Sequence, residues 1–225
     1  MTALRGVLFD MDGTLVDTER VWLDVVEAAA RRRGHALDAG RRTAVTGRSV
    51  GDTAAMLHGH LEAPEEELAA ELGADFAARL AAAVEPRPGA LRLLAALRER
   101  EVPTALVSAS PRAVVDQVAG TLAGHRFDAV FGAEDTVRTK PEPDPYLAAA
   151  AALGADPAQC VAVEDSPTGV ASARAAGCRV LAVPSTEPLA EADGVTLARS
   201  LTDVDPELLS SLVAREDGMT GCARE

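Results

Sequence analysis

The chain has 225 residues, of which 48% are hydrophobic and 25% charged, and this composition excludes wholesale disorder. Aromatic residues make up only 3%, so a core must be packed mainly with Ala, Leu and Val. The formal net charge is −13 at pH 7 and no long run of Lys or Arg offsets it, which argues against nucleic acid as a partner.

Short apolar runs and helical stretches alternate along most of the chain. Continuous apolar segments predict buried strands at residues 6–9, 104–107, 160–163 and 179–183, with a weaker one at 129–131. Helical stretches are expected at residues 88–100, 112–122, 144–153 and 167–176. Ser110 and Ser166 each precede a proline and are predicted to cap the helices that follow them. This order predicts an α/β fold with a doubly wound, Rossmann-like parallel sheet.

A second region, between the first and second predicted strands, reads as helical throughout. It contains helical stretches at residues 19–33, 51–60 and 64–84, and the Pro-rich run 85–89 then breaks the pattern. We therefore expect an α/β core domain of residues 1–16 and 87–216, interrupted by a helical domain of residues 17–86. The polar, unpatterned residues 217–225 are predicted to form a flexible tail.

The first predicted strand leads into the string Phe-Asp-Met-Asp-Gly-Thr-Leu-Val-Asp, residues 9–17. Asp10 and Asp12 lie two residues apart, so in an extended segment their side chains point the same way, at the sheet edge where such folds bind ligands. Buried carboxylates need a cation or a proton, and Mg²⁺ prefers oxygen ligands together with a substrate phosphate. Gly13 permits a sharp turn, and Thr14 offers a hydroxyl and an amide to a phosphate. An Asp-x-Asp pair alone is equally compatible with an acidic turn that caps a strand, but the whole string favours a site.

Three later segments supply matching groups. Ser108 follows the second predicted strand, and its hydroxyl and the adjacent amides can hold phosphate oxygens near a helix N-terminus, although simple capping would explain it alone. Glu164 and Asp165 follow another buried strand, and Mg²⁺ held together with Asp10 would give these acids the partner they need. Lys140, in a Pro-rich loop, is expected to balance the charge of Asp10 and of a bound phosphate.

The ordered set Asp-x-Asp-Gly-Thr, Ser, Lys-Pro and Glu-Asp resembles the motifs of the haloacid dehalogenase superfamily of phosphotransferases. The resemblance covers residues 4–205, and the helical insertion is similar to that of the subgroup with an α-helical cap. It implies a Mg²⁺-dependent enzyme in which Asp10 attacks phosphorus and forms an aspartyl-phosphate. Asp12 is implied to be the general acid and base, which protonates the leaving oxygen and then activates water.

The same resemblance implies which groups hold the metal and the phosphate. The implied Mg²⁺ ligands are Asp10, the main-chain oxygen of Asp12, Asp165, and Glu164 either directly or through water. The groups implied to hold the phosphoryl oxygens are Thr14, Ser108, the amide of Ala109, and Lys140. The metal and the lysine are expected to contribute most of the rate, because positioning and electrostatics dominate phosphoryl transfer.

Differences within the superfamily narrow the expected reaction. Dehalogenases and phosphonatases lack the second acid that Asp12 provides here, which leaves a phosphatase or a phosphomutase. Relatives of β-phosphoglucomutase usually carry a histidine where this chain has Trp22. Residues 18–22 and 108–111 instead resemble 2-deoxyglucose-6-phosphate and hexitol phosphatases. We therefore expect a phosphatase of a sugar or polyol phosphate; the alternatives are a mutase and a non-catalytic module that retains the fold.

Substrate choice in this subgroup is expected to rest with the cap, which closes over the core and excludes bulk water. The cap residues predicted to face the substrate are Glu19, Trp22, Gly47 and Arg48. Arg48 would supply positive charge or hydrogen bonds, and Trp22 a flat apolar wall. Packing of Trp22 between cap helices, and a solvated Arg48 in a turn, are equally compatible with the sequence.

The partner and location follow from the same observations. No segment approaches the roughly 20 apolar residues of a membrane span. Asp10 and Asp12 would also interrupt the apolar region of a signal peptide. We therefore expect a cytoplasmic enzyme, a monomer or homodimer, whose partner is a small phosphorylated metabolite and which binds neither membrane nor nucleic acid.

Overall fold

The computed structural model describes residues 3–46, 48–82, 84–122, 124–185, 188–190 and 192–214. The chain divides into two compact units, one made of Met1–Val16 and Pro86–Glu225 and the other of Asp17–Glu85. The first, called here the core unit, holds the described strands, whereas the second, the helical unit, holds helices α1 to α4. Among the described residues, no helix is both long and apolar enough to cross a membrane.

The core unit is built on a parallel sheet of six strands, which confirms the predicted fold class. In chain order the strands are β1 (Gly6–Phe9), β2 (Thr104–Val107), β3 (Ala129–Phe131), β4 (Cys160–Glu164), β5 (Arg179–Ala182) and β6 (Val195–Leu197). Their spatial order is β3-β2-β1-β4-β5-β6, so the chain moves outward from β1 on one side and from β4 on the other. Ligand sites of doubly wound sheets lie at the carboxyl ends of the strands where this direction reverses, here β1 and β4.

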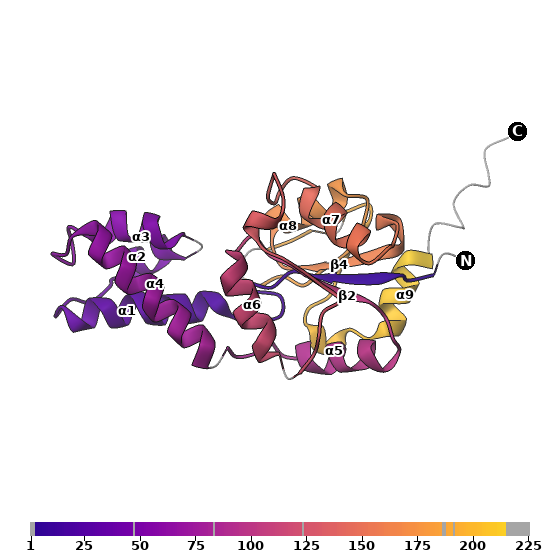
Figure 1. The fold of residues 1–225 in the computed structure, drawn as a ribbon, viewed down its shortest axis with the longest axis horizontal. Coiled ribbons are helices and arrows are strands. Elements are labelled where there is room, and N and C mark those ends of the chain that lie inside the picture. Colours follow the sequence, from indigo (N-terminus) through magenta and orange to yellow (C-terminus); the bar gives the residue numbers. More distant parts are fainter. Residues whose placement is uncertain are drawn as a thin grey trace, which may run out of the picture. The chain divides into compact units, whose positions relative to one another are not determined.

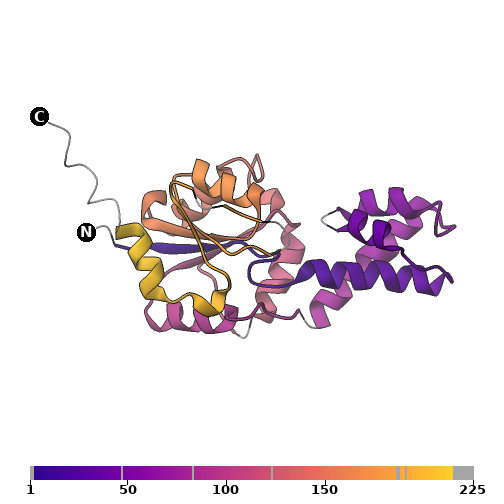
Figure 2. The same cartoon turned by 180° about the vertical axis from the view of Figure 1, so that it is seen from behind.

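Helices cover both faces of this sheet (Figure 1). Those of the core unit are α5 (Ala90–Glu99), α6 (Arg112–Thr121), α7 (Asp144–Ala152), α8 (Pro167–Ala175) and α9 (Pro206–Ala214). Helices α7 and α8 lie on one side of the sheet, and α5 and α9 lie together on the other, as Figure 2 shows from behind. Because both faces are covered, every residue of β1, β2 and β4 is buried, which explains their continuous apolar sequences.

Among the described strands and α-helices of the core unit, β6 and α9 have no counterpart among the predicted elements. Strand β6 has three residues, only the first of which is buried, so it lacks the apolar run that marks the inner strands. Helix α9 is short and packs against β4 and β5, which its own sequence does not reveal. Tertiary contacts rather than local patterns therefore define both elements.

The predicted helix caps are right at one position and wrong at the other. Ser166 caps α8, and its hydroxyl accepts a hydrogen bond from the Gly169 amide at 3.1 Å. Helix α6, by contrast, has no side-chain cap from Ser110. The carboxylate of Glu134 instead accepts from the Arg112 amide at 2.8 Å, so a segment distant in sequence satisfies this helix start.

The helical unit has a hydrophobic core of its own. It consists of α1 (Thr18–Arg32), α2 (Ala39–Val45), α3 (Val50–Leu57) and α4 (Glu65–Ala82), of which α2 has no predicted counterpart. Helix α4 packs against both α1 and α3. The Trp22 ring lies edge-on against Phe76 with centroids 5.2 Å apart, and its Nε1 donates to the Val45 carbonyl at 3.1 Å. The one tryptophan of the chain is therefore central to the packing of this unit.

Candidate active site

Asp10 follows β1 directly and lies beside the end of β4. The register pairs the residues before them, so Asp10 and Glu164 end neighbouring strands side by side. The Asp10 amide donates to the Val163 carbonyl at 3.0 Å, which fixes the chain at this point. Gly13 then turns the backbone with a φ of 85°, and a Cβ there would lie 2.0 Å from Asp165 Oδ2. Glycine is therefore required both for the turn and for the close approach of the Asp165 carboxylate.

Three buried carboxylates meet at this edge of the sheet. One oxygen each from Asp10, Glu164 and Asp165 lies within 4.8 Å of the others. Burial, and after it the negative charge of Glu164, raises the pKa of Asp10 well above its ordinary value. Burial also raises the pKa of Asp165 to about 6, although a hydrogen bond from Ser185 opposes the rise. Because burial disfavours the ionised forms of Asp10 and Asp165, the cluster needs positive charge close by if its carboxylates are to be ionised together.

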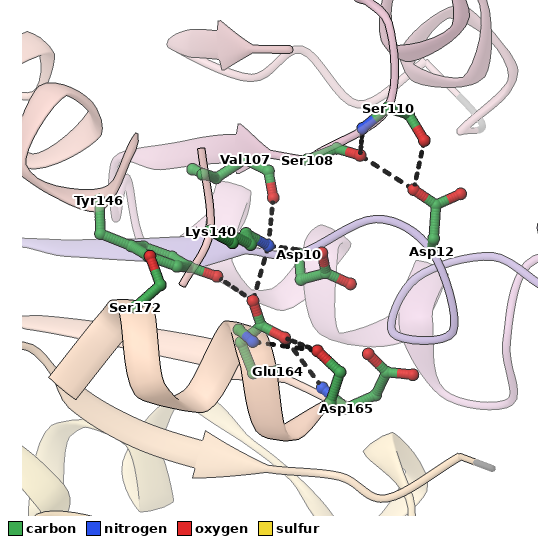
Figure 3. Close-up of polar contacts among 12 residues, drawn as sticks. Asp10, Asp12, Val107, Ser108, Ser110, Lys140, Tyr146, Glu164, Asp165 and Ser172 are labelled. Carbon is green, nitrogen blue, oxygen red and sulfur yellow. Dashed lines mark hydrogen bonds and ion pairs between the residues drawn. The ribbon is translucent and has the colours of Figure 1, made fainter. Parts of the chain in front are cut away.

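Lys140 provides the positive charge at the centre of the cluster (Figure 3). Its Nζ donates to Asp10 Oδ1 at 2.6 Å, to Glu164 Oε1 at 2.6 Å and to the Val107 carbonyl at 2.9 Å. Burial alone would lower the pKa of Lys140, but the charges of Asp10 and Glu164 outweigh it and raise that pKa above its ordinary value. This is the only lysine in the chain, and its compact ammonium matches three acceptors with three donors.

Glu164 is held from several sides. Besides Lys140, the Tyr146 hydroxyl donates to Oε1 at 2.5 Å, and the Asp165 amide donates to Oε2 at 3.2 Å. Gly169 leaves room for this carboxylate, since a Cβ there would lie 2.0 Å from its carbon. Both oxygens of Glu164 are therefore engaged by protein donors, and the side chain orients Lys140 toward Asp10.

Tyr146 was not among the residues predicted from the sequence. It is fully buried on α7, and the Lys140 Nζ lies 5.1 Å from the centre of its ring. It is the only tyrosine of the chain and stands six residues after Lys140, which is the one local signal that could have pointed to it. Its contact with Glu164 arises only in the folded chain.

Two serine hydroxyls hold Asp12. Ser108 Oγ and Ser110 Oγ each donate to Asp12 Oδ2 at 2.9 Å, and the Ser110 amide donates to Ser108 Oγ at 3.0 Å. The structure thus brings Ser108 to the Asp10–Asp12 segment, as the order of the strands requires (Figure 3). Ser110, predicted only as a helix cap, belongs to the same group.

Thr14 and Ala109 complete the predicted residues of the core unit. Thr14 is 1% exposed, and its Oγ1 has no hydrogen-bond partner among the described residues. A buried hydroxyl in this condition is the kind of group that accepts or donates once a ligand oxygen arrives. Ala109, next to Ser108, is exposed, so its surface is open to a ligand.

The remaining predicted residues belong to the helical unit. Glu19 lies in the first turn of α1 and is partly buried. Trp22 is 6% exposed and lies in the hydrophobic core of the unit, so it has the packing role that the sequence allowed. Its ring therefore has little surface left for a ligand. Arg48 lies beyond the end of α2 and is exposed, and its Nε donates to the Ala44 carbonyl at 2.5 Å. Gly47 lies outside the described residues, as do the residues of the predicted tail, 217–225.

The carboxylate cluster fits a divalent metal ion. Asp10 Oδ2 is buried and has no hydrogen-bond partner among the described residues. Lys140 supplies one positive charge against the three carboxylates of the cluster, so a divalent cation would balance what remains. A donor set made only of oxygens suits a hard cation.

Comparison with known proteins identifies a matching family and relatives named as phosphatases. Residues 4–177 match the family described as haloacid dehalogenase-like hydrolase. Validoxylamine A 7'-phosphate phosphatase of Streptomyces hygroscopicus subsp. limoneus is 34% identical, over 89% of this chain and 95% of that protein. Hexitol phosphatase A of Escherichia coli K12 is 37% identical, over 80% of this chain and 82% of that protein.

A solved structure shares the fold. A HAD family hydrolase from Deinococcus radiodurans R1, with bound phosphate and sodium, superposes with a TM-score of 0.71 and is 29% identical. The match covers 94% of this chain and 98% of that one. The likeness therefore extends over both units and not only over the sheet.

Proposed function

The chain belongs to the haloacid dehalogenase-like hydrolase family, and within it we propose that the protein is a Mg²⁺-dependent phosphatase of a small phosphate monoester. The observation that carries this proposal is the Lys140 ammonium bound to Asp10 and Glu164 inside a cluster of three buried carboxylates. A buried acid so placed can act as a nucleophile while a cation and a metal offset the charge of the incoming phosphoryl group.

The proposed chemistry takes place in two steps. The Asp10 carboxylate attacks phosphorus, and Asp12 protonates the leaving alcohol oxygen, so the phosphoryl group becomes an aspartyl-phosphate on Asp10. Asp12 then removes a proton from water, which attacks phosphorus, releases inorganic phosphate and restores Asp10. Support for this division comes from the structure: Asp10 is buried against Lys140, whereas Asp12 is partly exposed and held by serine hydroxyls.

The groups around Asp10 divide between metal and phosphate in this proposal. We expect Asp10, the main-chain oxygen of Asp12, Asp165, and Glu164 directly or through water to hold Mg²⁺, which would neutralise charge on the transferring oxygens. The phosphoryl oxygens would be held by Thr14, Ser108, the Ala109 amide and Lys140. The buried Thr14 hydroxyl, for which the described part of the chain offers no hydrogen-bond partner, supports its place in this set.

A sugar or polyol phosphate is the substrate class that we propose. Its support is the similarity to the validoxylamine A 7'-phosphate and hexitol phosphatases, each aligned over four fifths or more of this chain. We further propose that the helical unit serves as a cap that selects the substrate, with Glu19 and Arg48 among its contacts. A small phosphorylated metabolite is the only partner proposed, and a cytoplasmic location stays a prediction.

Phosphate release from a panel of phosphorylated metabolites, with Mg²⁺ or with EDTA, tests this function. We expect Mg²⁺-dependent release that favours hexose or polyol phosphates and disappears in Asp10→Asn. Full activity of Asp10→Asn would overturn the mechanism. Silence of the folded wild-type enzyme across the panel, together with isomerisation of β-glucose 1-phosphate, would support the mutase alternative instead.

A further inference from the structure

Two serine hydroxyls donate hydrogen bonds to the same carboxylate oxygen of Asp12. Ser108 Oγ and Ser110 Oγ both donate to Oδ2, each at 2.9 Å. A single good hydrogen bond would already orient a carboxylate, so the second serine is not needed merely to order the side chain of Asp12 in the absence of a ligand.

The fold dedicates Ser110 to this contact. Ser110 stands where the sequence predicts a helix cap, but Glu134 accepts the Arg112 amide at 2.8 Å and makes that role unnecessary. The close approach of the two segments depends on Gly132, where a Cβ would lie 2.6 Å from the Arg112 Cα. The Ser110 carbonyl also accepts from the Ala133 amide at 2.9 Å. The hydroxyl of Ser110 is thereby released from capping, and the Ser110 backbone is held by its own hydrogen bond.

Ser108, in contrast, has two acceptors to serve. Its hydroxyl carries one proton and can donate a single hydrogen bond. In the proposed function Ser108 holds a phosphoryl oxygen, and while it does so its proton is no longer available to Asp12. Ser110 is then the serine that still donates to Asp12 Oδ2 during phosphoryl transfer.

We propose that Ser110 is the positioning residue that holds the Asp12 carboxylate in place once the phosphoryl group has engaged Ser108. By donating to Oδ2, Ser110 keeps the Asp12 carboxyl oriented while that group passes its proton to the leaving group. This inference rests on the proposed phosphatase function, and it assigns different tasks to two serines that are two residues apart.

The dependence of the rate on the leaving group tests this assignment. The value of kcat/KM reports events up to transfer of the phosphoryl group to Asp10, and only a poor leaving group needs a proton from Asp12 in that step. The two substrates are p-nitrophenyl phosphate, whose leaving group departs without a proton, and the polyol phosphate that the wild-type enzyme hydrolyses best. Ser110→Ala should lower kcat/KM for the polyol phosphate by about ten- to a hundredfold and leave that for the aryl phosphate nearly unchanged.

Two further variants separate positioning from other roles. Ser108→Ala should lower kcat/KM for both esters to a similar extent, because Ser108 holds a phosphoryl oxygen, not Asp12, during transfer from either ester. Ser110→Thr keeps a hydroxyl and should restore hydrolysis of the polyol phosphate. Ser211→Ala, on α9, removes a hydroxyl that donates to the Leu208 carbonyl and should leave both substrates unaffected.

The outcomes are distinguishable. Equal losses on both esters in Ser110→Ala, or no loss on either, would overturn the positioning role, as would a failure of Ser110→Thr to restore activity. If Ser110→Ala lowers Tm, Ser110→Cys repeats the comparison with a side chain of similar size and a weak donor. A wild-type enzyme without phosphatase activity, or an active Asp10→Asn, would instead remove the proposed function itself.

Discussion

Replacing Lys140 with methionine tests how much one ammonium group stabilises the buried acids. Methionine keeps the unbranched apolar stem but removes the charge and all three donors. The Nζ atom lies 2.6 Å from both Asp10 Oδ1 and Glu164 Oε1. The Lys140 side chain is only 5% exposed, so water has little access to the space that the ammonium would leave. Removing one partner of such a buried pair costs about 3–5 kcal/mol in the free energy of unfolding.

This cost translates into a measurable shift of the melting temperature. For a chain of this size, about 1 kcal/mol corresponds to a change of about 2–4 °C in Tm. Lys140→Met, in EDTA at neutral pH, should therefore melt about 6–20 °C below the wild type in differential scanning calorimetry. Added Mg²⁺ should recover part of the loss, because the metal offsets charge that the lysine no longer balances.

The loss should also depend on pH in a defined direction. The pKa of Asp10 is already raised by burial, and removal of the ammonium would raise it further. A carboxyl with a raised folded-state pKa contributes stability below its unfolded pKa, and this contribution is lost as pH rises through the folded pKa. The gap between Lys140→Met and the wild type should therefore shrink in mildly acidic buffer, where Asp10 takes up a proton.

A matched control lies two residues away in the same loop. Arg138 pairs with Glu142 and Asp144 at 3.0 and 2.8 Å, but its side chain is 59% exposed. Arg138→Met should cost less than about 1 kcal/mol, because solvent screens such a pair. Equal melting temperatures of Lys140→Met and the wild type at neutral pH in EDTA would refute the claim that the ammonium stabilises the cluster.

Three further predictions follow from the geometry. Gly169→Ala should remove most phosphate release, because its Cβ would lie 2.0 Å from the Glu164 carboxyl carbon. Gly120→Ala is the control and should keep its activity, because position 120 has open space around it. Equal activities of the two variants would contradict this prediction. Mg²⁺ should raise Tm more above pH 6 than below it, because burial raises the pKa of Asp165 to about 6 and the ionised carboxylate is the ligand. Calorimetry with and without Mg²⁺, above and below pH 6, measures this difference, and an equal rise in Tm on both sides would contradict it. Trp22→Ala should destabilise the helical unit by about 3–5 kcal/mol, measured by circular dichroism during thermal unfolding, and an unchanged Tm would argue against its core position.

The parts of the fold and site that the sequence predicts are those encoded by neighbouring residues. Strand β1 is a continuous apolar run, and the buried Asp10 follows it directly. The same holds for β4 and Glu164, so parallel pairing alone brings the two acids together. The convergence of Lys140 on both could be expected once those acids were known to need a cation.

The parts that could not be predicted depend on contacts between distant segments. Nothing near Ser110 shows that Glu134 will cap α6 and free its hydroxyl for Asp12. The contact of Tyr146 with Glu164 likewise joins residues 18 positions apart on different elements. For Trp22 the sequence allowed both packing and substrate contact, and the contacts with Phe76 and Val45 in the folded unit favour packing.

The presence of a single lysine in the chain also makes the site accessible to spectroscopy. In a protein labelled with lysine carrying ¹⁵N at Nζ, one ammonium resonance would arise, and it would come from Lys140. Because three acceptors hold its three protons, those protons should exchange slowly enough with water to be observed. The arrival of phosphate or a metal ion at Asp10 could then be followed directly, without turnover and without a labelled ligand.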